Sequence, residues 1–87
     1  MDFNLIWHEK AIDDLKKIDR TKAKEIIEKV KGYLIQDPMK LGKPLYGEFK
    51  GLYRFRFGSF RIIYAADEKQ GTLTILKIGH RKDVYKR

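Results

Sequence analysis

Alternating apolar and polar residues in the second half of the chain predict a β-hairpin over Gly51–Tyr64, which reads G-L-Y-R-F-R-F-G-S-F-R-I-I-Y. Gly58 and Ser59 form its two-residue loop, and a glycine at the first loop position suits the type II′ turn that matches the twist of paired strands. This turn fixes the register of the hairpin. The expected pairs are Phe57 with Phe60, Arg56 with Arg61, Phe55 with Ile62, Arg54 with Ile63, and Tyr53 with Tyr64.

Side chains alternate between the two faces of a strand, so this hairpin has one apolar face and one basic face. The apolar face is expected to line the core and carries Tyr53, Phe55, Phe57, Phe60, Ile62 and Tyr64. The basic face carries Leu52, Arg54, Arg56, Arg61 and Ile63. Arg56 and Arg61 are directly opposed there, and opposed like charges cost stability. This arrangement suggests that an anion binds the basic face.

The first half of the chain predicts two amphipathic helices. Apolar residues recur at helical spacing within Glu9–Ile18 and again from Ala23 to Leu34. Asp19 can cap the second helix, and Asp37 before Pro38 ends it, because a residue that precedes proline is disfavoured in helical geometry.

Two more strands complete the expected fold. Asp2–Trp7 alternates in polarity, and Thr72–Ile78 is rich in β-forming residues. Met39–Lys50 contains one proline and two glycines and is expected to be an irregular connection. The predicted order is therefore β-α-α-β-β-β, a small α+β fold with two helices on one face of a mostly antiparallel, twisted sheet. The basic face stays uncovered.

Length and composition are consistent with one domain over residues 1–87, since 43% of the residues are hydrophobic. The chain has no Cys, which removes disulfides, thiol catalysis and zinc-ribbon sites. We find no leader sequence and no apolar run of the roughly 20 residues that a membrane helix needs. We therefore expect a cytoplasmic protein with no membrane partner.

The net charge of +8 is unevenly distributed. Residues 1–50 hold 11 Lys and Arg against 9 Asp and Glu, whereas residues 51–87 hold 9 against 3. The excess lies in the half that contains the basic face, which favours a nucleic acid or another polyanion as partner. The alternative is a basic protein whose charged surface is only solvated.

Few other groups suggest chemistry. The two histidines lie in different elements, no acidic cluster offers oxygen ligands, and no glycine-rich phosphate loop precedes a helix, so neither a metal nor a cofactor is expected. Imidazole transfers protons readily near neutral pH, so His80 is a candidate acid or base, although it can equally be a surface turn residue. Tyr85 can stack on a base. Four guanidinium groups can hold phosphates and stabilise transition-state charge, although Arg61 can instead be a structural anchor. They belong to Arg54, Arg56, Arg61 and Arg81.

Two blocks of sequence carry a family resemblance. The first is K-P-L-Y-G-x-x-x-G-L-Y-R-F-R-x-G-x-x-R-I-I-Y over Lys43–Tyr64, and the second is I-L-K-I-G-H-R-x-D-V-Y over Ile75–Tyr85. Together with the length and the element order, they resemble the RelE/ParE superfamily of toxins from prokaryotic toxin–antitoxin modules. RelE-type members are endoribonucleases that cut mRNA in the ribosomal A site, and ParE-type members poison DNA gyrase.

The resemblance to RelE-type toxins implies an active site, a mechanism and partners. The implied mechanism is attack of a ribose 2′-OH on the adjacent phosphate, which leaves a 2′,3′-cyclic phosphate and needs no metal or cofactor. A RelB-like antitoxin and the ribosome, with its rRNA and A-site mRNA, are the implied partners. Having all five of the matching positions favours the RelE branch. These positions are Arg54, Arg56, Arg61, Arg81 and Tyr85.

The chain departs from well-known bacterial relatives at one point. They have lysines where this chain has Arg54 and Arg56, and one of those lysines is a proposed general base. Because an arginine keeps its proton in proteins, the role of base passes to His80, to Tyr85, or to the mRNA and ribosome, or activity rests on charge stabilisation alone. A ParE-like gyrase inhibitor and a non-catalytic RNA-binding relative remain alternative functions.

Overall fold

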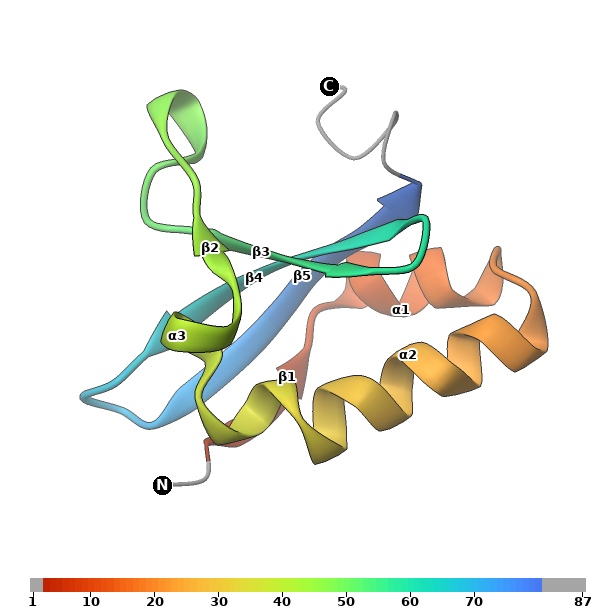
Figure 1. The fold of residues 1–87 in the computed structure, drawn as a ribbon, viewed down its shortest axis with the longest axis horizontal. Helices are drawn as coiled ribbons and strands as arrows, with labels where there is room; N and C mark the ends of the chain where they lie inside the picture. The colour runs from red at the N-terminus through yellow and green to blue at the C-terminus, as the bar shows by residue number, and fades with distance from the viewer. Residues whose placement is uncertain (1–2, 81–87) are drawn as a thin grey trace.

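The computed structural model describes residues 3–80, which form a five-stranded mixed sheet with helices packed against one face (Figure 1). The strands are β1 (Asn4–Trp7), β2 (Lys43–Pro44), β3 (Tyr53–Phe57), β4 (Phe60–Asp67) and β5 (Thr72–His80). The helices are α1 (Glu9–Lys16), α2 (Arg20–Gly32) and the short α3 (Pro38–Leu41), with 3-10 turns η1 (Leu34–Gln36) and η2 (Gly47–Phe49). The strand order is β1-β5-β4-β3-β2, in which β1 runs parallel to β5 and the other neighbours are antiparallel. The predicted α+β fold is confirmed.

The β3–β4 hairpin has the predicted register at all five pairs, including Arg56 opposite Arg61. Gly58 has a φ of 59°, whereas Ser59 is not in the positive-φ region. This combination matches a type II′ turn, which needs a positive φ only at the first loop position. The sequence therefore determines the register through one glycine.

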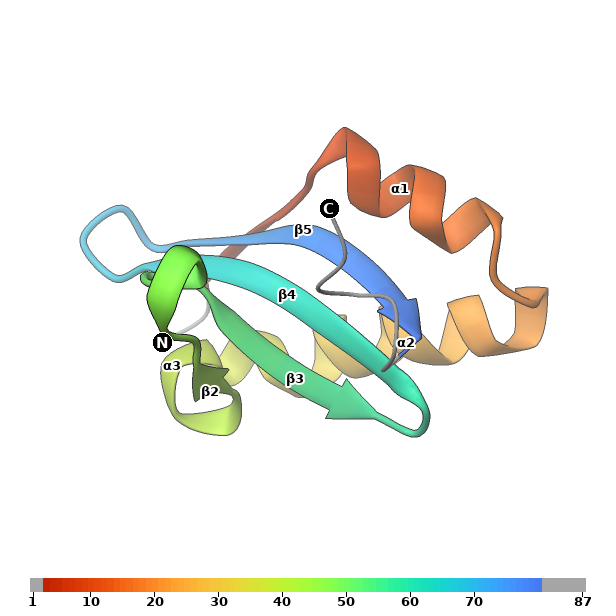
Figure 2. The same cartoon turned by 90° about the horizontal axis from the view of Figure 1, so that it is seen from above.

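The core lies between the apolar face of the hairpin and the two longer helices. It joins side chains of α1 and α2, such as Ala11 and Ile26, to those of the central strands, such as Ile62 and Ile75. Seen from above, β3, β4 and β5 lie in front of α2, and none of the helices formed by residues 3–80 covers the opposite face (Figure 2). The face expected to carry the arginines, which we call the open face, is therefore not covered by a helix of residues 3–80.

Side chains cap the N-termini of both longer helices, α1 and α2. The imidazole of His8 accepts a hydrogen bond from the Lys10 amide (3.1 Å) at the start of α1, and Asp19 accepts one from the Lys22 amide (3.3 Å) as predicted. Asp14 accepts a bond from the Ile78 amide (2.9 Å), so α1 satisfies part of the β5 edge that β1 does not reach. His8 therefore has a structural role.

Several predicted boundaries differ from the structure. The helix α1 ends at Lys16 rather than at Ile18, because the amides of Lys17 and Ile18 bond to carbonyls three residues back and tighten its end. The helix α2 ends at Gly32 rather than Asp37, because η1 tightens the chain and Pro38 then starts α3, a position where its missing amide costs nothing. The segment Met39–Lys50 contains the end of α3, β2 and η2, whose lengths are too short to produce a periodic pattern. The strand β5 extends to His80 because it continues to pair with β4. Asp2, the predicted start of the first strand, lies outside the described residues.

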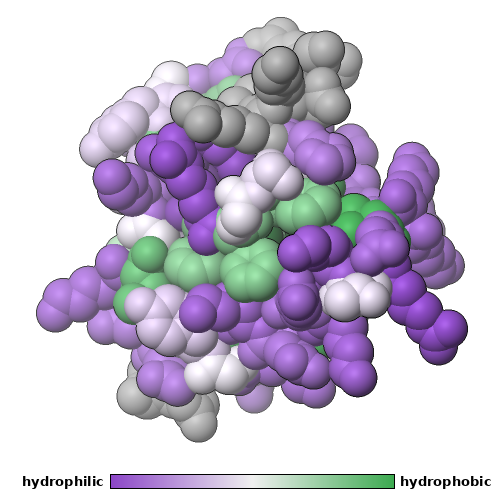
Figure 3. Space-filling view, turned by 45° about the vertical axis from the view of Figure 1, so that its right-hand side comes forward, coloured by the Kyte–Doolittle hydropathy of each residue, from purple (hydrophilic) through white to green (hydrophobic). Residues whose placement is uncertain are grey.

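Some apolar side chains at the margin of the core are partly exposed to solvent. Phe55 and Phe57 are half-buried and pack against the core from the margin of the sheet. Figure 3 shows a largely hydrophilic surface with a band of apolar side chains across its middle. No helix within residues 3–80 is both long and apolar enough to span a membrane.

Candidate functional site

The register of the sheet arranges the charged side chains of the open face in two rows. Arg56 on β3 lies opposite Arg61 on β4, which lies opposite Gly79 on β5. Two residues along, roughly 6.6 Å by strand geometry, a second row crosses four strands. Its members, from β2 to β5, are Lys43, Arg54, Ile63 and Lys77. The two rows, which we call the basic rows, bring together five cations from four strands.

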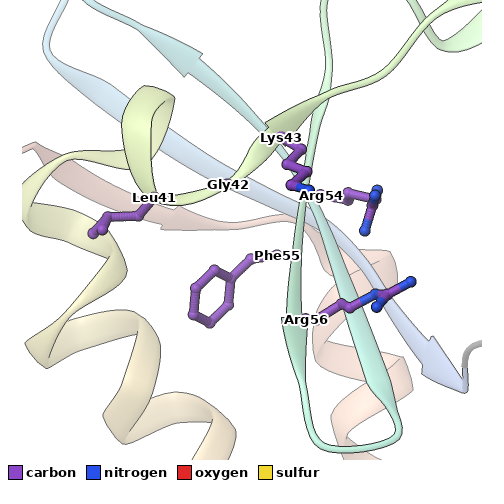
Figure 4. Close-up of a pocket in the computed structure, with 6 residues that line it drawn as sticks. All are labelled: Leu41, Gly42, Lys43, Arg54, Phe55 and Arg56. Carbon is purple, nitrogen blue, oxygen red and sulfur yellow. The ribbon is translucent and has the colours of Figure 1, made fainter.

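The arginines of the basic rows differ in burial. Arg54 and Arg61 are half-buried, and the Nε atom of Arg61 is inaccessible to solvent, whereas Arg56 is exposed. Ile63 between them is only 5% exposed, so it gives the rows an apolar base. Figure 4 shows Arg54 and Arg56 leaving β3 on one side and Phe55 on the other. Partial burial strengthens the attraction of these cations for an anion, because the local dielectric is lower than in bulk water.

A pocket of about 270 Å³ lies beside the outer edge of β3 (Figure 4). The strand β2 pairs only with Tyr53 and Arg54, so the edge of β3 is not covered by β2 from Phe55 onward. The lining residues are Leu41, Gly42, Lys43, Arg54, Phe55 and Arg56. The pocket is therefore a recess at one margin of the basic rows, next to the surface that an extended anionic chain would follow.

The close approach of β2 to β3 depends on Tyr64 and Gly42. The buried Tyr64 hydroxyl donates to the carbonyl of Pro38 (2.6 Å), which holds the start of α3, and its ring stacks on Tyr53 at 5.7 Å. Burial, and to a lesser extent the neighbouring Tyr53, raises the pKa of Tyr64. A Cβ atom at Gly42 would overlap the Tyr64 hydroxyl and lie 2.7 Å from the Arg54 carbonyl oxygen. The glycine therefore allows β2 to place Lys43 opposite Arg54.

The structure does not bring His80 to the arginines. His80 pairs with Phe60, and the two rings lie 4.7 Å apart between centroids, on the face that the helices cover. Arg61, the next residue after Phe60, projects to the opposite face. His80 instead borders a second pocket of about 410 Å³ beside Asp14 and the α1–α2 connection. Arg81 and Tyr85 lie outside the described residues.

Lys43 and Lys77 belong to the basic rows but were not predicted from the sequence. Lys43 lies on a strand of two residues, which has no detectable alternation. Lys77 follows a β-bulge, because Tyr64 pairs with Ile75 and Ile63 pairs with Lys77, which leaves Leu76 as an extra residue. By alternation from Ile78, the bulge gives Lys77 the face of its partner Ile63, and it keeps both Ile75 and Ile78 in the core. Lys77 also borders the second pocket, beside Asp14 of α1. The sequence signal that could have indicated this position of Lys77 is the lysine itself, which stands between two core isoleucines in a strand.

Within residues 3–80 there is no group of three or more His, Cys, Asp or Glu side chains arranged to bind a metal ion. The charged side chains of the basic rows are guanidinium and ammonium groups, which bind phosphate oxygens.

Comparison with known proteins identifies the family. A sequence model described as ParE toxin of type II toxin-antitoxin system, parDE, matches residues 5–85. The chain thus belongs to this RelE/ParE family of toxins from type II toxin–antitoxin systems.

Particular relatives carry RelE-type names. The chain is 35% identical to Toxin RelG of Mycobacterium tuberculosis over 74 residues, which is 85% of each chain. It is 34% identical to Toxin RelE of the same organism over 76 residues, 87% of this chain and 78% of the relative. The crystal structure of the toxin-antitoxin complex RelBE2 from Mycobacterium tuberculosis superposes with a TM-score of 0.88 at 30% identity, covering 93% of this chain and 100% of that chain.

Proposed function

We propose that this toxin is a ribosome-dependent endoribonuclease that cuts mRNA in the ribosomal A site and thereby inhibits translation. The observation that carries the proposal is the pair of basic rows on the open face. Arg54 on β3 and Arg61 on the neighbouring strand β4 are both half-buried there. Guanidinium groups in this setting can neutralise the charge that develops on a phosphate during transfer. Sequence similarity to relatives named RelE and RelG supports the same branch.

In the proposed reaction, the ribose 2′-oxygen attacks the adjacent phosphorus. The bond from phosphorus to the 5′-oxygen breaks, the 2′-proton goes to a base, and the leaving 5′-oxygen gains a proton. The products are a 2′,3′-cyclic phosphate and a 5′-hydroxyl end, with no metal or cofactor required by the scheme. Arg61 and Arg81 stabilise the charged transition state, Arg54 and Arg56 hold phosphates, and Tyr85 orients the codon.

Under this proposal, fewer groups remain as candidates for the general base. Arg54 and Arg56 keep their protons. His80 lies on the face that the helices cover, so proton transfer from a phosphate-linked ribose at Arg61 would have to pass around the sheet. We therefore assign the base role to Tyr85, or to the mRNA and ribosome, in preference to His80.

We also propose a RelB-like antitoxin as the cytoplasmic partner. The Mycobacterium tuberculosis structure with the same fold is a toxin-antitoxin complex. An antitoxin that covers the open face would block access to the basic rows. The mechanism of neutralisation is then competition for one surface.

A ParE-like gyrase inhibitor is the second candidate, because the matching family model carries the ParE description. The two activities differ in the macromolecule that breaks. Induced expression without the antitoxin should arrest growth, and primer extension should show cuts within translated codons. Intact mRNA together with gyrase-linked DNA breaks would establish the ParE-like function instead. Steeply salt-dependent RNA binding with intact mRNA and no DNA breaks would indicate a non-catalytic relative.

A further inference from the structure

Next to the basic rows, the open face carries an uncharged row. Ala65 on β4 pairs with Thr74 on β5, which pairs with Ile6 on β1. On the other side, Leu45 continues the line of β2, and its amide donates to the Leu52 carbonyl (2.9 Å). By alternation, these residues share the face of Arg54 and Ile63. We call Leu45, Leu52, Ala65, Thr74 and Ile6 the neutral row.

The chain between Leu45 and Leu52 forms a loop at the end of the neutral row. It rises above the sheet on the side opposite α2 (Figure 1). Hydrogen bonds within the loop fix its shape: the Phe49 amide donates to the Tyr46 carbonyl (3.3 Å), and the Leu52 amide donates to the Phe49 carbonyl (3.1 Å). The loop is therefore preorganised, which lowers the entropy cost of binding a ligand on it.

Tyr46 on this loop is 79% exposed, the highest value among the exposed large apolar side chains of residues 3–80. The other described tyrosines pack against neighbours. Tyr53 and Tyr64 stack on each other, and Tyr33 contacts Phe55 at 6.0 Å between ring centroids. The ring of Tyr46 thus contributes little to the fold, although exposing it to water is unfavourable.

We propose that Tyr46 is a stacking platform for an unpaired base of the RNA strand bound on the basic rows. The inference rests on the proposed function and adds a nucleotide subsite to it. A strand that runs along β3 from Arg56 toward the loop meets cations at two successive rows, then an uncharged row, and then an exposed aromatic ring. Phosphates need cations and bases need apolar or aromatic surfaces, so the order of the rows matches one nucleotide after another.

The same ring could instead anchor a protein partner, since tyrosine is common at interfaces. The charge of the neighbourhood favours RNA. Lys43 lies three residues before Tyr46 and Lys50 four residues after it, and both are exposed, against one exposed carboxylate on the loop, Glu48. A position flanked by cations, beside two rows of further cations, is suited to a polyanion.

The test uses the full-length toxin and ribosomes programmed with an mRNA whose A site is vacant. The mRNA carries the fluorescent base 2-aminopurine at one codon or flanking position at a time, and a 2′-deoxy sugar at the cut site blocks cleavage. Wild-type toxin should quench the fluorescence at one position. Tyr46→Phe, which keeps the ring, should quench it equally, and Tyr46→Ala should not.

The cleavable mRNA gives a second readout. Stacking of a base on an aromatic ring is sequence-tolerant and strengthens binding substantially, so Tyr46→Ala should weaken the apparent affinity for programmed ribosomes roughly 5- to 100-fold with unchanged thermal unfolding. Tyr33→Ala, a change of an exposed tyrosine on the helix-covered side, is the matched control and should quench the fluorescence as the wild-type toxin does.

The outcomes separate the two proposals. Wild-type cleavage with equal quenching and affinity in Tyr46→Ala would overturn the stacking platform and leave the ribonuclease intact. A loss of antitoxin affinity alone in Tyr46→Ala would show that the ring serves a protein partner and would also overturn it. Absence of cleavage by the wild-type toxin would overturn the ribonuclease itself, and the platform with it.

Discussion

The two faces of the β3–β4 hairpin share a backbone and differ in what their side chains contact. On one face, Ile62 and Tyr64 are fully buried against the helices. On the other, Arg56 and Arg61 are directly opposed, and no helix of the described chain covers them. Apolar burial favours folding, whereas opposed like charges disfavour it. The comparison shows that the covered face stabilises the fold and that the open face retains a costly arrangement suited to an anion.

The largest stability effect is expected on the covered face. Ile62→Ala should lower the free energy of unfolding by about 2–5 kcal/mol, because it removes buried methyl groups and leaves a cavity. Urea denaturation monitored by circular dichroism measures this loss. The neighbouring Arg61→Ala is the matched control and should change stability much less. Equal losses for both variants would contradict the division between the faces.

The largest activity effect is expected on the open face. Arg61→Ala should reduce the cleavage rate on programmed ribosomes about 10²- to 10³-fold, the range found when one donor to a developing anion is removed. Lys69→Ala, on the exposed β4–β5 turn, provides a control of equal charge change. If Arg61→Ala cleaves at the wild-type rate, Arg61 has a structural role and is not part of the active site.

Tyr64 connects the two faces, since its ring lies in the core and its hydroxyl holds the start of α3. Tyr64→Phe leaves the Pro38 carbonyl without this donor and should cost about 1–3 kcal/mol of stability. The raised pKa of Tyr64 also predicts a pH effect. The unfolded chain ionises Tyr64 near pH 10 while the folded chain keeps it neutral, so stability should fall as pH rises above about 10.

Unfolding of wild type and Tyr64→Phe, compared from pH 7 to pH 11, isolates this contribution. The difference in stability between the two proteins should shrink above about pH 10. A constant difference across the whole range would show that Tyr64 ionises equally in the folded and unfolded states.

The smallest effect concerns the edge of the basic rows. Lys43→Ala should weaken toxin binding to programmed ribosomes and reduce the slope of log affinity against log salt by about 0.7, the value for one phosphate contact on single-stranded RNA. Lys31→Ala, an exposed residue of α2, should leave the slope unchanged. An unaltered slope in Lys43→Ala would remove Lys43 from the phosphate-binding surface.

The sequence predicted the hairpin register and both faces, because a two-residue loop with one glycine leaves a single pairing. It did not predict the short elements α3 and β2, since four- and two-residue segments carry no periodicity. It missed Lys77 because a bulge breaks the alternation after Ile75. The sequence also did not assign His80 to either face of the sheet, because the length of β5 depends on pairing with β4 rather than on local propensity.

The resemblance to RelE-type toxins correctly predicted the family, whereas the roles of individual site residues remain predictions. The basic rows extend the predicted site by Lys43 and Lys77, whose positions depend on tertiary pairing. The sequence also did not single out Tyr46, because the exposure of its ring depends on how the loop leaves the sheet.

The central claim is that the open face positions mRNA for attack by its own 2′-hydroxyl. The most direct measurement uses purified toxin, ribosomes with a vacant A site, and end-labelled mRNA, with the 3′ ends of the products analysed chemically. The account predicts a cut within the A-site codon that ends in a 2′,3′-cyclic phosphate, requires the ribosome, and disappears when the attacking sugar is 2′-deoxy. Intact mRNA under these conditions, or cleavage of the 2′-deoxy substrate, would contradict it.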